Sequence, residues 1–249
     1  MILLRPQDTL HKSHLLRLLM EIMDDTVLAA ALRFKGGTCA AMMGILDRFS
    51  VDLDFDLTPN ADEHMLRKRF HDVFSHLELI VDNESKKALE FFVKYKSIPG
   101  QRNTIKIDAL NVRYNAATYA PQYLQEINRT VLCQTIDTIV ASKLVAPLDR
   151  FTRNKTIAGR DIYDIHHFFL QGLPYNRELI TERTNGNCPT FFGRLIGFID
   201  RYVTQTVINE DLNTLLPPIH FQRIRKILKQ ETLQFLTLER ERMIHDEPA

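Results

Sequence analysis

The chain has 249 residues, 45% of them hydrophobic, which suffices for one large domain or two small ones around a packed core. Its 32 lysines and arginines almost balance 31 aspartates and glutamates, which excludes a uniformly basic chain and leaves any cationic surface local. Three cysteines without a CxxC pair exclude a disulfide framework and most structural zinc sites, and they favour a reducing, cytoplasmic setting. No uncharged apolar run of about 18 residues occurs, so we expect a protein that is neither secreted nor spans a membrane.

Two helices open the predicted fold. Apolar residues recur at helical spacing over 13–23, and TVLAAALRF (26–34) continues in the same manner. A glycine turn, GGT (36–38), interrupts this pattern, and CAAMMGIL (39–46) has the composition of a short helix that begins there. The turn therefore offers main-chain N–H groups that could receive an anion.

Strands dominate the next part of the chain. RFSVDLDFDL (48–57) alternates apolar residues with aspartates, which predicts a strand with one apolar and one anionic face. A helix is expected over 61–77. Three further strands are expected in LELIVDN, ALEFFVKYK and NTIKIDAL.

From about residue 134 the pattern is helical almost throughout. The predicted helices cover 135–149, 160–171, 176–183, 189–208 and 219–243. This order of elements predicts an α+β fold, in which a small mixed β-sheet core precedes a largely helical C-terminal half. It places the two domains at 1–133, with the N-terminal helices, and at 134–249.

Asp52 and Asp54 are the first candidates for chemistry. They lie two residues apart on the predicted strand, so their side chains leave the same face with Cα atoms roughly 6.5–7 Å apart. A divalent cation such as Mg²⁺ would relieve their repulsion, whereas an isolated Asp-x-Asp is more often a solvated strand face. The glycine turn and Asp108, on a later strand, favour the metal site. The whole set, Gly36, Gly37, Thr38, Asp52, Asp54 and Asp108, is an arrangement that could hold a nucleoside triphosphate with its metal ions.

These residues resemble a known family. The run FKGGTCAAMMGILDRFSVDLDFDL is similar to the signature of the nucleotidyltransferase superfamily that includes DNA polymerase beta. The Arg48-Phe49-Ser50 lead-in resembles the AbiEii-type abortive-infection toxins, and so do two later segments, KLVAPLDR (143–150) and RDIYD (160–164). The chain departs from the family pattern in having no arginine soon after the glycine turn and in having Pro147 within the first of these segments.

The resemblance implies a nucleotidyltransferase core that uses Mg²⁺, or alternatively Mn²⁺, to transfer NMP from an NTP to an acceptor hydroxyl. It further implies the toxin of a bacterial toxin–antitoxin or phage-defence system, with the 3′ end of tRNA as acceptor and a helix-turn-helix antitoxin as partner. Two alternatives stay open. The acceptor hydroxyl could belong to a protein or a small molecule, or the chain could be a non-catalytic nucleotide- or RNA-binding module.

Roles for individual residues follow from the same resemblance. Asp52, Asp54 and Asp108 would bind the metal, with Asp108 also drawing off the proton of the hydroxyl. The nucleotide would be held by Gly36, Gly37, Thr38, Lys143, Arg150 and Arg160, with Lys143 also offsetting the developing charge.

The cations of 143–160 could grip phosphates or an RNA backbone, or they could form a merely solvated loop. Asp161 is a better candidate than Asp164 for contact with the substrate. Both acids could instead pair with Arg150 or Lys143, because a spacing of three puts them on one helix face.

Overall fold

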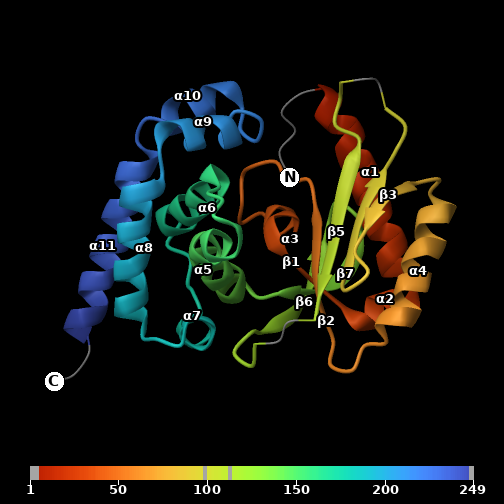
Figure 1. Cartoon of the computed structure of the whole chain (residues 1–249), viewed down its shortest axis with the longest axis horizontal. Coiled ribbons are helices and arrows are strands. Elements are labelled where there is room, and N and C mark those ends of the chain that lie inside the picture. Colours follow the sequence, from red (N-terminus) through yellow and green to blue (C-terminus); the bar gives the residue numbers. More distant parts are fainter. Residues whose placement is uncertain (1–5, 98–99, 112–113, 247–249) are drawn as a thin grey trace. The chain divides into compact units, whose positions relative to one another are not determined.

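The computed structural model describes residues 6–97, 100–111 and 114–246. The chain forms two compact units (Figure 1). Unit 1 comprises Met1–Arg113 and Thr118–Thr135, and unit 2 comprises Tyr114–Ala117 and Ile136–Ala249. The chain therefore enters unit 2 briefly, returns to unit 1 and then completes unit 2.

Unit 1 opens with the helices α1 (Pro6–Asp24) and α2 (Thr26–Ala31). Asp25 separates them, and its carboxylate caps α2 by accepting hydrogen bonds from two main-chain N–H groups at 2.9 and 3.0 Å. The predicted second helix is wrong at its end, because Leu32–Lys35 forms strand β1. Alternate side chains of β1 are buried, and both of its partner strands come from later in the chain, so the local helical spacing concealed it.

The described strands form a seven-stranded mixed sheet with the order β3-β4-β5-β2-β1-β7-β6. Strand β1 pairs antiparallel with β2 and parallel with β7, and β2 pairs in parallel with β5. The remaining strands are β2 (Leu53–Leu57), β3 (Ile80–Glu84), β4 (Leu89–Lys94), β5 (Thr104–Leu110), β6 (Tyr119–Leu124) and β7 (Arg129–Gln134). The prediction missed β6 and β7, since the edge strand β6 reads YAPQYL and its proline is unusual in a strand.

Helices cover both faces of this sheet (Figure 1). Helices α1 and α4 (Glu63–His76) lie against one face, and the short helix α3 (Gly36–Met42) lies against the other. The apolar residues of the inward face of the two central strands, including Phe55 of β2 and Ile107 of β5, are buried. The core thus fixes β2 and β5 side by side, with their polar residues on the opposite face.

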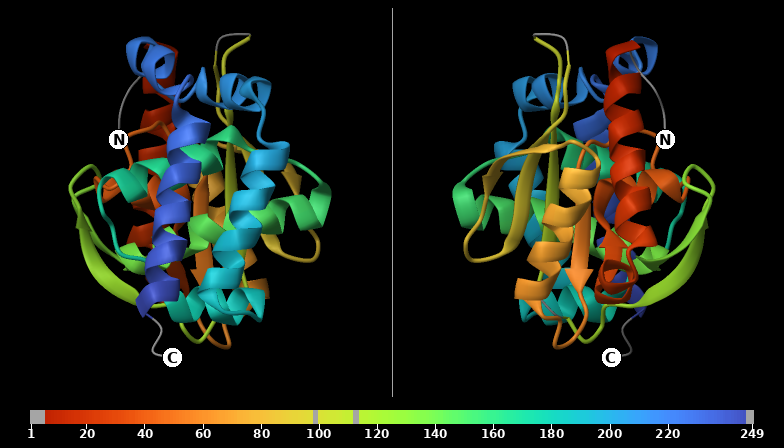
Figure 2. Two further views of the ribbon diagram at one scale, coloured as in Figure 1. Left: turned by 90° about the vertical axis from the view of Figure 1, so that its left-hand side faces the viewer. Right: turned by 90° about the vertical axis from the view of Figure 1, so that its right-hand side faces the viewer.

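Unit 2 is helical, and the helices α8 and α11 run side by side within it (Figure 2). Its helices are α5 (Ile136–Asn154), α6 (Gly159–Leu170), α7 (Arg177–Thr184), α8 (Cys188–Tyr202), α9 (Gln205–Leu212), α10 (Pro218–Ile224) and α11 (Leu228–Asp246). The predicted class, a mixed sheet followed by a largely helical C-terminal half, is confirmed. Two predicted helices are each broken in two. Thr204 caps the start of α9 through the N–H of Val207, and residues 225–227 separate α10 from α11.

The segment Tyr114–Ala117 is tied to α7. Glu182 accepts hydrogen bonds from the main-chain N–H groups of Asn115 and Ala116, at 2.8 and 2.9 Å. The side chain of Asn176 donates to the carbonyl oxygen of Ala116 at 2.8 Å. Within the described part of the chain, no helix combines the length and hydrophobicity that crossing a membrane requires.

Candidate active site

The glycine turn of unit 1 lies where β1 passes into α3. Gly36 has a φ of +79°, a conformation that residues with a Cβ rarely adopt. A Cβ at this position would lie 2.9 Å from the Cβ of Asp54 and closer still to its Oδ2. Gly36 is therefore required both by the turn and by the carboxylate that lies against it.

Thr38 fixes this turn to the segment before β2. Its side chain is fully buried, and its hydroxyl lies 2.9 Å from the hydroxyl of Ser50 and 2.5 Å from the carbonyl oxygen of Asp52. The predicted phosphate contact of Thr38 would therefore come from its main chain, because the hydroxyl is engaged within the protein.

Arg48 places a guanidinium beside the same turn. Its side chain is only 3% exposed, and it donates to the carbonyl oxygen of Phe49 at 3.0 Å. A Cβ on Gly37 would lie 3.2 Å from Nη2 of Arg48. The sequence lacks the arginine expected after the glycines, and Arg48, from the segment before β2, brings a cation to this turn.

Asp54 and Asp108 are neighbours across the parallel pair β2–β5. Their Cα atoms are paired in register, so both side chains leave the same face of strands that lie about 4.8 Å apart. Asp52 lies one residue before β2. The structure therefore brings two of the three predicted metal ligands into register and places the third at the start of the same strand.

Asp108 carries an unusual oxygen. Its Oδ2 accepts a hydrogen bond from Lys106 at 3.0 Å, whereas its Oδ1 is buried and has no hydrogen-bond partner among the described residues. A buried carboxylate oxygen without a partner is costly, so a cation bound there would satisfy it. Lys106 also pairs with Glu90 at 2.8 Å. Partial burial lowers the pKa of Lys106, but its hydrogen bonds to Glu90 and Asp108 and the charges of both acids outweigh this effect and raise the pKa above its usual value.

Asp56, the third aspartate of β2, is held quite differently. It is 7% exposed, and its carboxylate binds Lys35 at 2.5 Å, the Tyr119 hydroxyl at 2.8 Å and the Gln134 amide at 2.9 Å. Burial and the negative charge of Asp56 raise the pKa of Tyr119, so the phenol stays a hydrogen-bond donor. Asp56 therefore joins β2 to β1, β6 and β7.

The acidic residues are suited to bind a metal ion whose remaining ligands come from a substrate. Within the described ranges, no group of three or more His, Cys, Asp or Glu side chains could hold a metal ion alone. Mg²⁺ commonly binds through one or two carboxylates and completes its shell with water and substrate phosphates. The pair Asp54 and Asp108, with the unpartnered oxygen of Asp108, matches this requirement.

The predicted residues of unit 2 form two ion pairs between α5 and α6. Lys143 lies 2.8 Å from Asp164, which is fully buried, and Arg150 lies 2.9 Å from Asp161, which is 1% exposed. The cations are the more exposed partners, with 16% of the Lys143 side chain and 32% of the Arg150 side chain accessible. Both acids thus pair with these cations and fix their positions. The sequence had left this pairing open as an alternative to contact with the substrate.

The other predicted features of unit 2 are simpler. Arg160 lies at the start of α6, where its main-chain N–H donates to Asp211 at 3.3 Å. Pro147 is buried inside α5, and the helix continues through it to Asn154. Lys106 and Arg48 were not predicted from the sequence as residues of this site. The signal for Lys106 was its position two residues before Asp108, which puts both side chains on the same face of the strand.

Comparisons with known proteins identify a family and similar folds. A family model described as "Nucleotidyl transferase AbiEii toxin, Type IV TA system" matches residues 17–241. No curated protein matches the chain.

Three solved structures are similar in fold. A proposed nucleotidyltransferase of Helicobacter pylori has 18% identity and a TM-score of 0.60, and the match covers 99% of this chain and 100% of that one. JHP933, also from H. pylori, has 17% identity and a TM-score of 0.57, with coverage of 98% and 97%. The nucleotidyltransferase toxin MenT4 of Mycobacterium tuberculosis has 18% identity and a TM-score of 0.52, with coverage of 95% and 87%.

Proposed function

Because the chain belongs to the AbiEii nucleotidyltransferase toxin family, we propose that this toxin transfers NMP from an NTP to the 3′ end of tRNA. The activity class follows from the family match over 17–241, and the donor and acceptor are the parts proposed. The hydroxyl oxygen of the acceptor would attack the α-phosphorus of the NTP and form a new P–O bond. The bond from the α-phosphorus to the oxygen that bridges it to the β-phosphorus would break, and pyrophosphate would leave.

One observation supports the catalytic part of this proposal above the others. The carboxylate of Asp54 touches the turn glycine Gly36 on one side and lies in register with Asp108 on the other. Asp108 in turn has a buried oxygen without a partner among the described residues. A glycine turn that could receive a phosphate and paired carboxylates at one place are what triphosphate chemistry needs.

Different residues would bind the metal ion, accept the proton and bind the triphosphate. Asp52, Asp54 and Asp108 would hold Mg²⁺, or alternatively Mn²⁺, which when bound offsets the charge of the transferred phosphoryl group. Asp108 would also accept the proton of the attacking hydroxyl. The main chain of Gly36, Gly37 and Thr38 would orient the triphosphate, and Lys143, Arg150 and Arg160 would neutralise its charge.

The biological setting is proposed from the family. A toxin of a toxin–antitoxin pair needs a cognate antitoxin, for which we propose a helix-turn-helix protein. We also propose that the toxin acts in the cytoplasm, where tRNA is found, and that it serves in phage defence. The odd number of cysteines, all free and buried in this structure, is consistent with a reducing compartment.

The deciding experiment incubates the purified protein with each α-labelled NTP, total bacterial RNA and Mg²⁺, and then separates the RNA on a gel. Label on tRNA is expected with the wild type and none with Asp54→Asn. Asp82→Asn is the matched control, because Asp82 is an exposed residue of the edge strand β3 that pairs with Lys94 at 2.6 Å. It should label tRNA as the wild type does.

Other outcomes would redirect the proposal. Label on a protein or a small molecule would replace tRNA as the acceptor. Full activity of Asp54→Asn, or full activity in EDTA, would contradict the roles given to the acids and the metal. NTP binding without any transfer would leave a non-catalytic binding module.

A further inference from the structure

A pocket lies entirely within unit 2, and none of its lining residues has a catalytic role above. It has a volume of about 410 Å³ and is formed by the end of α6 and the turn after it, the first residue of α7 and the last turns of α11. This volume falls within the range of roughly 300–1,000 Å³ that is typical of small-ligand sites. Gly172 has a φ of +64°, and it opens the turn that forms one rim.

Aromatic rings form the wall of this pocket. Phe169 and Tyr175 stack with their ring centroids 6.3 Å apart, and Tyr175 also meets Phe192 at 5.6 Å. Leu173 and Pro174 complete the apolar surface. Of these rings Phe169 and Tyr175 line the pocket, and exposed parts of aromatic rings favour a planar ligand.

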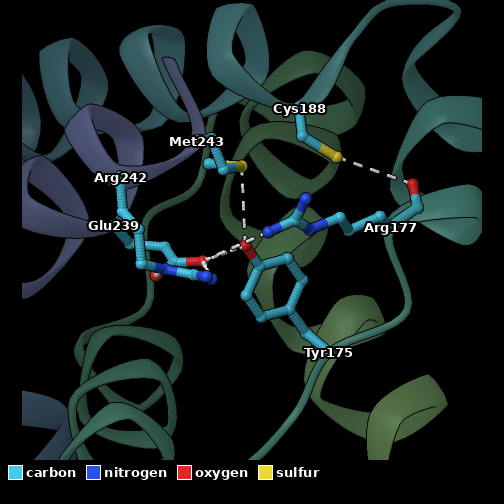
Figure 3. Close-up of polar contacts among 6 residues, drawn as sticks. All are labelled: Tyr175, Arg177, Cys188, Glu239, Arg242 and Met243. Carbon is cyan, nitrogen blue, oxygen red and sulfur yellow. Dashed lines mark hydrogen bonds and ion pairs between the residues drawn. The ribbon is translucent and has the colours of Figure 1, made fainter. Parts of the chain in front are cut away.

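Ionised groups lie beside the Tyr175 ring (Figure 3). Glu239, whose side chain is 14% exposed, accepts from Arg242 at 2.6 and 2.9 Å and from the Tyr175 hydroxyl (Figure 3). Arg177 lies 4.0 Å from the same carboxylate, at the outer limit of an ion pair. Half or more of each arginine side chain is exposed.

The charges of the lining are therefore unequal. Two guanidiniums face one carboxylate, which leaves a net charge of +1 beside the aromatic wall. Guanidinium groups bind phosphate through paired hydrogen bonds and also stack on planar rings. One anionic group on a planar body is the complementary ligand.

We propose that this pocket binds a single nucleotide unit, with the base against Phe169 and Tyr175 and the phosphate on Arg177 and Arg242. The unit is either a free nucleotide or one residue of an RNA chain, since both present the same base and phosphate. In the second case the site deepens the proposed function by giving the RNA acceptor a contact outside the acidic residues of unit 1. An acidic peptide lacks the planar body, so it would leave the aromatic wall uncovered.

The test measures binding without NTP, so it does not depend on transfer. A fluorescein-labelled single-stranded RNA is titrated with the full-length protein, and anisotropy gives the affinity. Arg177→Gln with Arg242→Gln should weaken binding about tenfold or more, as expected for lost charge-assisted hydrogen bonds. The control Arg194→Gln with Arg223→Gln removes the same charge from exposed positions of α8 and α10 outside the pocket, and should change affinity about twofold at most.

Two further variants separate binding from folding. Arg177→Gln alone removes the long ion pair to Glu239 and the contact of this exposed guanidinium with Tyr175, so it should change the thermal melt little while it weakens binding. Phe169→Leu should weaken binding without changing the charge, because it removes a stacking surface. Competition with free AMP, GMP, CMP and UMP then distinguishes the source, since displacement indicates a free-nucleotide site and its absence at millimolar concentration indicates an RNA residue.

Equal loss of affinity in the pocket and control double variants would overturn the proposal, and so would unchanged affinity in Arg177→Gln and Phe169→Leu. Displacement of the RNA by a poly-glutamate peptide, but not by nucleotides or unlabelled RNA, would also overturn it. A protein that binds RNA through these residues yet transfers nothing would contradict the proposed function alone.

Discussion

Asp54 and Asp56 lie two residues apart on β2, and their surroundings give the two carboxylates different tasks. Three donors enclose Asp56, whereas Asp54 faces the glycine turn and Asp108. The alternation of apolar residues with aspartates predicted that both carboxylates lie on one face of the strand. It could not predict that their surroundings differ. The partners of Asp56 include Tyr119 and Gln134, which lie on strands that the sequence did not reveal.

Asp56→Asn should destabilise the protein. The amide loses the ion pair with Lys35 and can no longer accept from all three donors, so the half-buried lysine keeps an unpaired charge. We expect the free energy of unfolding to fall by about 3 kcal/mol, measured by urea denaturation. Asp54→Asn is the comparison and should unfold nearly as the wild type does. A loss of stability as large in Asp54→Asn would contradict the division of roles.

Gly36→Ala should abolish transfer. The alanine Cβ would overlap the carboxylate of Asp54 and would force it to move. Gly44→Ala is a matched control, because Gly44 also has a positive φ, +77°, but has open space where the Cβ would go. The control should lose about 1 kcal/mol of stability and keep its activity. If both variants transfer nucleotides equally well, the contact between Gly36 and Asp54 has no catalytic role.

His11 makes stability depend on pH. It is fully buried on α1, with Nε2 3.0 Å from the carbonyl oxygen of Val51 and Nδ1 2.9 Å from the Tyr95 hydroxyl. Burial, helped by the charges of Arg102 and His14, lowers its pKa, while the hydrogen bond to the Val51 carbonyl and the charge of Asp8 raise it, and the net pKa is about 4. Between pH 6.5 and 4 the unfolded chain therefore takes up a proton that the folded chain does not.

Stability should consequently fall as the pH drops, by about 2 kcal/mol between pH 8 and pH 5 from His11 alone. Thermal melts over this range measure the effect. His11→Gln can still donate to Val51 but does not titrate, so its melting temperature should vary less with pH. His14, whose pKa burial and Arg17 also lower, supplies a smaller remainder in both proteins. Identical pH profiles would show that His11 is not the titrating group.

At the scale of elements, the sequence predicted those whose pattern is local. The alternating aspartates indicated β2, and 61–77 contained α4. Strand β1 was not predicted, because LRFK continues a helical pattern until β2 and β7 pair with it. The register of Asp54 with Asp108 likewise depends on the parallel pairing of β2 with β5, which no local pattern encodes.

The helices α5 and α6 provide a test of the role of Lys143. Lys143→Met should lower the free energy of unfolding by about 3–5 kcal/mol, because it leaves the charge of the buried Asp164 without its partner. Adding Asp164→Leu should restore most of that stability. Transfer should fall about 10²–10³-fold in both variants if Lys143 contacts the triphosphate. Recovery of activity together with stability in the double variant would give the lysine a structural role only.

For the whole molecule, the family match predicts an effect on growing cells. Expression in bacteria without an antitoxin should arrest growth, and Asp54→Asn should not, because the arrest requires transfer. Sequencing of RNA 3′ ends after induction should find untemplated nucleotides on tRNA. Arrest with unmodified tRNA ends would move the target to another RNA, a protein or a small molecule.

Because the chain passes from unit 1 to unit 2 and back, the order of its synthesis bears on the order in which its parts can fold. Tyr114–Ala117 leaves the ribosome before its anchor Glu182, which follows Asn115 by 67 residues. At roughly 5–20 residues per second, the anchor arrives about 3–13 s later. Strands β6 and β7 are synthesised within that interval, so the sheet can be completed while this segment is still an open loop. A nascent chain halted before residue 182 would thus carry a complete sheet and an incomplete helical unit. The sheet of unit 1 can therefore fold before unit 2 does.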